Sequence, residues 1–139
     1  MVREAAAGVV RDGRARLGEG EHAEGGRHLA LTPANPAACA LTVWPDYPTL
    51  CLGGDEGSCT ELFGDEATRL RELRDLVEAV IAGRFSWRRR QVRRRFLFLR
   101  FGPTTQFVGT FDTPGGPWAF TREGLEPAGR AEHRTYEPY

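Results

Sequence analysis

The chain has 139 residues and a formal net charge of zero, because 19 basic residues balance 19 acidic ones. That length suits one domain with a modest core and is too short for two. A balanced charge excludes a global electrostatic attraction to nucleic acid or to an anionic membrane. Every basic residue is arginine, which indicates a GC-rich and most simply a bacterial genome, in which arginine codons are common.

Residues 1–27 mix glycine with charges of both signs and hold few aliphatic side chains besides Val9 and Val10. Such a segment buries little apolar surface, so we expect a poorly ordered N-terminal arm. It lacks the apolar run of a signal peptide, and no run in the chain approaches the roughly 18 residues of a membrane-spanning helix. We therefore expect a cytoplasmic protein that does not associate with membranes.

The cysteines are three in number and include no Cys-x-x-Cys pair. An odd number of cysteines fits reduced thiols better than a disulfide framework. The spacing is also not that of a structural zinc site. We therefore predict that Cys39, Cys51 and Cys59 are free, buried thiols and that the protein holds no metal.

Residues 28–125 are predicted to form a single α+β domain, followed by a polar C-terminal tail at residues 126–139. Short apolar runs bounded by proline or glycine predict strands on both sides of one helix. These strands are expected at residues 29–32, 40–44, 49–52, 59–63, 106–111 and 118–121. The predicted fold is a mainly antiparallel sheet with one main amphipathic helix packed on one face.

The helix is expected from Asp65 to Ala82. Six aliphatic residues recur at steps of three and four and so share one face: Leu70, Leu73, Leu76, Val77, Val80 and Ile81. Asp65 suits the N-cap, and Gly83 suits the left-handed position after the helix. This stripe is predicted to pack against the sheet.

Residues 85–101 contain no glycine or proline and are long for one strand. Phe85 and Trp87 are at odd positions, whereas Val92 and Phe96 are at even ones, so the buried face should change between them. Either a β-bulge or a tight turn would produce this change. We favour one bulged strand whose apolar end, residues 96–101, is central in the sheet.

The most distinctive feature is a set of eight arginines between residues 84 and 100, with no acidic residue among them. The candidate binding surface consists of these residues: Arg84, Phe85, Trp87, Arg88, Arg89, Arg90, Arg93, Arg94 and Arg95. In a regular strand, Arg88, Arg90 and Arg94 share one face, and Arg89, Arg93 and Arg95 share the other. One of the two arginine sets should therefore face solvent.

No motif in the chain indicates a catalytic residue or a cofactor, so an enzyme is the less favoured interpretation. The first hypothesis is a non-enzymatic protein-interaction module that binds an acidic face of another protein, by analogy with small bacterial regulators or immunity proteins. The alternative is a nucleic-acid-binding domain that uses the same strand, with guanidinium groups on phosphates and aromatic rings for stacking. A third possibility is an unrecognised small-molecule enzyme or binding pocket between helix and sheet.

Overall fold

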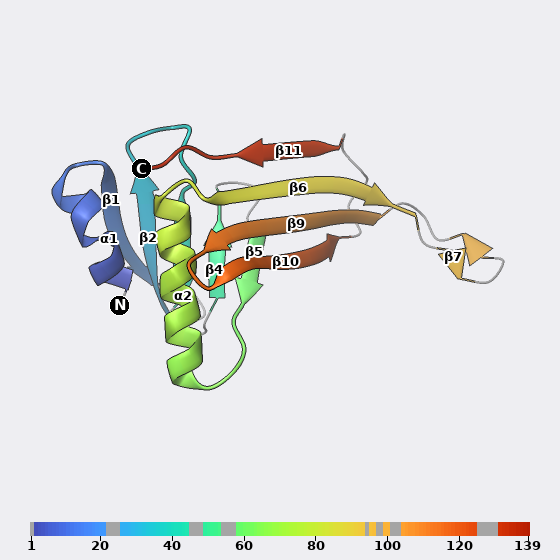
Figure 1. Cartoon of the computed structure of the whole chain (residues 1–139), viewed down its shortest axis with the longest axis horizontal. Coiled ribbons are helices and arrows are strands. Elements are labelled where there is room, and N and C mark those ends of the chain that lie inside the picture. The colour runs from blue at the N-terminus through green and yellow to red at the C-terminus, as the bar shows by residue number, and fades with distance from the viewer. Residues whose placement is uncertain are drawn as a thin grey trace.

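The computed structural model describes residues 2–21, 26–44, 49–53, 58–93, 95–96, 99–100, 104–124 and 131–139. These residues form two helices and two main antiparallel sheets (Figure 1). The α+β class and the antiparallel pairing predicted from the sequence are therefore confirmed, but the expected single helix and single sheet are not. No helix within the described ranges is long and apolar enough to cross a bilayer.

The first sheet is a five-stranded meander in which each strand pairs with the next along the chain. Its strands are β1 (Ala15–Glu21), β2 (Arg27–Pro33), β3 (Leu41–Trp44), β4 (Thr49–Leu52) and β5 (Ser58–Glu61). Alternate side chains of the inner strands are fully buried, including Leu41, Val43 and Leu50. The four strands predicted before the helix are thus confirmed, with small differences at their ends.

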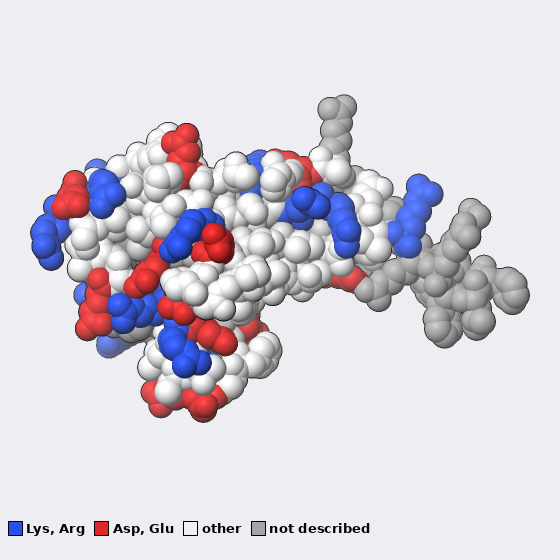
Figure 2. All heavy atoms as spheres, in the orientation of Figure 1, with Lys and Arg blue, Asp and Glu red and all other residues white. Residues whose placement is uncertain are grey.

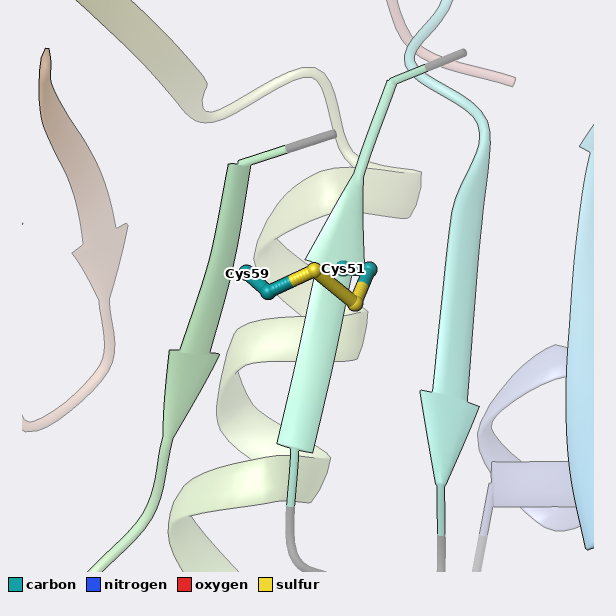
Figure 3. Close-up of a disulfide and its surroundings, with 2 residues drawn as sticks. All are labelled: Cys51 and Cys59. Carbon is teal, nitrogen blue, oxygen red and sulfur yellow. A yellow bond between two sulfur atoms is a disulfide. The ribbon is translucent and has the colours of Figure 1, made fainter. Parts of the chain in front are cut away.

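The opposite face of this sheet carries a disulfide. Cys51 on β4 and Cys59 on β5 are direct partners in the register, and their Cα atoms lie 4.0 Å apart. Figure 3 shows the bond on the side of the sheet away from α2. The prediction of three reduced thiols is wrong, because an odd number of cysteines still allows one pair and the strand register selects it. Cys39 is free and buried.

Helix α2 (Glu66–Ile81) begins and ends where the sequence places it. The Asp65 carboxylate accepts a hydrogen bond from the Thr68 amide at 2.8 Å, and Gly83 has the left-handed φ of +69°. Most of the predicted stripe is buried, namely Leu73, Leu76, Val77 and Val80. Leu70 is an exception, because 44% of its surface is exposed.

Residues 2–21 do not form the loose arm that we expected. Helix α1 (Val2–Arg11) buries three residues of one face, Val2, Ala6 and Val9. Strand β1 then pairs with β2 over its whole length. The sequence did not suggest this helix because its buried face consists of one alanine and two valines far apart in the chain. Their spacing of four and three residues is nevertheless that of a helix face.

The second sheet has the strand order β10–β9–β6–β11 and is antiparallel throughout. Its strands are β6 (Phe85–Val92), β9 (Thr104–Thr113), β10 (Gly116–Gly124) and β11 (Glu132–Thr135). In Figure 1 it projects away from the two helices. Strands β9 and β10 confirm the two strands predicted after the helix.

The favoured prediction of one bulged strand over residues 85–101 is wrong. Strand β6 pairs with β9 without interruption from Phe85 opposite Phe111 to Val92 opposite Thr104, so it contains no bulge. Beyond it, β7 (Arg95–Phe96) pairs only with β8 (Leu99–Arg100), in a separate two-stranded ladder. The apparent change of face arose because Val92 is half-buried on the outer face and does not belong to the core.

The C-terminal segment also differs from the polar tail that we expected, although residues 125–130 lie outside the described ranges. Strand β11 pairs with β6, and the final residue, Tyr139, is buried. The Tyr139 amide donates a hydrogen bond to the Ile81 carbonyl at the end of α2. A Cβ atom on Gly83 would lie 2.6 Å from the Pro138 nitrogen, so glycine is needed there for the backbones to approach.

Candidate arginine-bearing surface

The two faces of β6 have opposite character. Phe85 and Trp87 point to the inner face, where only 2% and 7% of their surfaces are exposed. Arg88 and Arg90 alternate with them and are exposed on the outer face. Arg88 and Arg90 therefore share one face of β6, as predicted. The two aromatic residues lie on the opposite face from these exposed arginines.

The aromatic residues of the candidate surface belong to the core. The ring of Phe85 lies 4.6 Å from that of Phe111 and stacks on Tyr136 at 5.6 Å. The Trp87 indole N–H donates a hydrogen bond of 2.8 Å to the Tyr136 hydroxyl, and the Arg134 guanidinium lies 5.4 Å from the indole ring. Neither residue is available as an aromatic anchor for a partner.

Arg89 is likewise engaged within the protein. Its guanidinium donates a hydrogen bond of 3.1 Å to the Glu132 carboxylate on β11, and only 21% of its side chain is exposed. The same carboxylate accepts a 2.6 Å bond from Arg134. Arg89 therefore joins β6 to β11 and is unavailable to a partner.

Towards the end of β6, Arg88 and Arg90 are exposed on its outer face, and Arg93 is exposed directly after the strand. The Arg90 Nε donates a 2.7 Å hydrogen bond to the Gln106 side chain on β9, which holds its guanidinium against the outer face. Figure 2 shows basic side chains over the part of the molecule where Figure 1 places β6. We call these three residues the arginine face.

The other predicted residues are placed differently or not at all. Arg84 is exposed, but it lies at the junction of α2 and β6, where its amide donates to the Ala79 carbonyl. Arg94 lies outside the described residues. Arg95 lies in β7, and its side chain is not among those described. Of the predicted residues whose side chains are described, the exposed ones are Arg84, Arg88, Arg90 and Arg93, whereas Phe85, Trp87 and Arg89 are engaged within the protein.

The free thiol of Cys39 lies outside this surface. The thiol of Cys39 is buried, and desolvation raises its pKa to about 11, so it remains protonated and poorly nucleophilic near neutral pH. Within the described residues, no three His, Cys, Asp or Glu side chains gather closely enough to hold a metal ion. The arginine face offers charge and hydrogen-bond donors, which are means of binding.

No protein-family model, curated protein or solved structure matches the chain.

Proposed function

We propose that this protein is a non-enzymatic protein-binding module and that its arginine face binds an acidic surface of another protein. The observation that carries the proposal is that Arg88 and Arg90 are exposed on the outer face of strand β6, with Arg93 exposed directly after the strand. Guanidinium groups held by a sheet can pair with carboxylates at a lower entropic cost than groups on a flexible segment.

The burial of Phe85 and Trp87 favours a protein partner over nucleic acid. Recognition of single strands depends on aromatic rings on which bases stack, and these two rings are covered by Phe111 and Tyr136. Binding to double-stranded nucleic acid requires no stacking. Tight binding does require many contacts to phosphates, and the three guanidinium groups of the arginine face are few for that purpose.

The test compares capture of partners from extracts of the native host by the wild-type protein and by a variant with Arg88, Arg90 and Arg93 changed to Gln. We expect the variant to lose a partner that the wild type retains. The matched control changes Arg11, Arg16 and Arg71 to Gln, because these three arginines are also exposed but lie on other elements. The control should retain the partner.

Binding to a labelled random DNA duplex provides the opposing measurement. We expect no tight binding at roughly physiological ionic strength. Tight, steeply salt-dependent binding that only the first variant loses would replace the proposed function with nucleic-acid binding. Identical capture by all three proteins would remove the arginine face from any binding role.

The cytoplasmic location remains a prediction. The disulfide removes the argument from reduced cysteines, because bonds of this kind persist mainly in oxidising compartments.

A further inference from the structure

A groove of about 770 Å³ lies between the edges of the two sheets. On one side it is lined by residues 118–122 of β10, and on the other by residues 59–61 of β5 together with Thr49 of β4 and Phe63. Side chains alternate along a strand, so a groove over one face would contact every second residue. The runs of consecutive residues on β10 and β5 therefore indicate that the groove follows the edges of these two strands.

Both strands are terminal members of their sheets. β5 ends the five-stranded order and β10 ends the four-stranded order, so each has one strand neighbour among the described residues. The unpaired side of an edge strand presents backbone N–H and C=O groups that can receive another strand. Strand β10 is the better template, because it spans Gly116–Gly124, whereas β5 spans only Ser58–Glu61.

The side chains beside these edges include three aromatic rings, and their net charge is close to zero. Phe63, just after β5, is 77% exposed, and Trp118 and Phe120 on β10 are half-buried. The Trp118 and Phe120 rings lie 5.5 and 6.2 Å from the buried ring of Phe111, which fixes them in place. Glu61 and Arg122, the charged residues of the described lining, cancel each other.

We propose that this groove binds an extended, uncharged peptide segment of a partner protein, which pairs with the β10 edge and packs apolar side chains against Phe63 and Trp118. The balance of Glu61 and Arg122 selects against a strongly acidic or basic segment. Because β5 bounds the groove on its far side, a single extended segment suits it better than a second copy of this protein, which would bring a whole sheet. The groove contains no residue of the arginine face, so this inference is independent of the proposed function.

The experiment selects binders from a phage-displayed library of random ten-residue peptides on the immobilised full chain. We expect enrichment of uncharged sequences with apolar residues at every second position, because a pleated strand directs alternate side chains to one side. A synthetic peptide of the selected sequence should bind Phe63→Ser at least tenfold more weakly than wild type. Methylation of alternate peptide amides should abolish binding, because it removes the backbone donors.

Leu70→Ser is the matched control, since Leu70 is also an exposed large apolar residue but lies on α2 outside the groove. It should bind the peptide like the wild type. Failure to enrich any peptide, or equal binding by wild type and Phe63→Ser, would overturn the proposal. So would light scattering that shows a wild-type dimer and a Phe63→Ser monomer, because the groove would then belong to a second copy.

Discussion

At the scale of single residues, two leucines of α2 that look equivalent in the sequence differ in their burial. Leu70 and Leu73 are three residues apart and belong to the same apolar stripe, but Leu73 is 2% exposed and Leu70 is 44% exposed. The difference arises because Leu70 lies near the N-terminal end of the helix. The two leucines therefore form a matched pair for measuring what the helix packing contributes.

We predict that Leu73→Asp unfolds the protein, whereas Leu70→Asp does not. A carboxylate at Leu73 would be buried without a partner and would also remove apolar packing, a cost of about 4 kcal/mol or more, which is comparable with the whole stability of a small domain. At Leu70 the carboxylate reaches water, and the change should stay within about 1 kcal/mol. Urea unfolding followed by circular dichroism measures both. Equal midpoints for the two variants would contradict the packing described here.

Local rules explain why some residues could be placed from the sequence and others could not. The cap Asp65 and the left-handed Gly83 depend on their own backbone, so the sequence was sufficient for both. The exposure of Leu70 and the burial of Phe85 depend on elements distant in the chain. Arginine and aromatic residues that are neighbours in the sequence suggest a shared binding surface. In the folded strand such neighbours point to opposite faces, and the strand pairing decides which face is buried.

At the scale of elements, the largest departure from expectation is helix α1, which contributes to the same core as α2. Ala6 is completely buried and the next residue, Ala7, is exposed. The pair provides a test in which residue type and helix propensity are identical.

We predict that Ala6→Asp destabilises the protein strongly, by about 3 kcal/mol or more, because it buries an unpaired charge. Ala7→Asp should change the free energy of unfolding by about 0.5 kcal/mol or less, as is usual on a surface. Thermal unfolding measures both variants. Deletion of residues 1–21 should also lower the melting temperature, and an unchanged melting temperature after that deletion would restore the loose-arm prediction.

The disulfide between β4 and β5 is a further feature that the sequence did not predict. We predict one free thiol, that of Cys39, when the protein is denatured without reductant and treated with a thiol-specific reagent. A bond across a loop of eight residues should stabilise the fold by about 2–3 kcal/mol, so a reductant should lower the melting temperature.

A double variant with Cys51 and Cys59 changed to Ala provides the control for this measurement. It should melt below the oxidised wild type and should not respond to the reductant. Three free thiols in the untreated protein would contradict the pairing and would restore the original prediction for the cysteines.

At the scale of the whole molecule, the C-terminus closes the structure. Arg14, just before β1, donates a hydrogen bond of 3.2 Å to the Tyr139 carbonyl, and the Tyr139 hydroxyl donates to the Cys39 carbonyl. The Glu137 amide donates to the Ala37 carbonyl. Glu137 and Tyr139 thus connect the residue before β1, the segment before β3 and the end of α2. Composition suggested a polar tail there because prolines and charges surround the two tyrosines.

We predict that Tyr139→Ala destabilises the protein by about 3–5 kcal/mol, because it removes a buried ring and leaves a cavity between these segments. Tyr139→Phe retains the ring and loses only the hydroxyl bond to Cys39, so it should cost about 1 kcal/mol.

Desolvation raises the pKa of the buried Tyr139 phenol, so the wild type should lose stability as the pH rises above the usual tyrosine range, more than Tyr139→Phe does. Unfolding of all three proteins at neutral and alkaline pH measures these differences. If Tyr139→Ala proves as stable as the wild type, the C-terminus does not hold the two ends of the fold together.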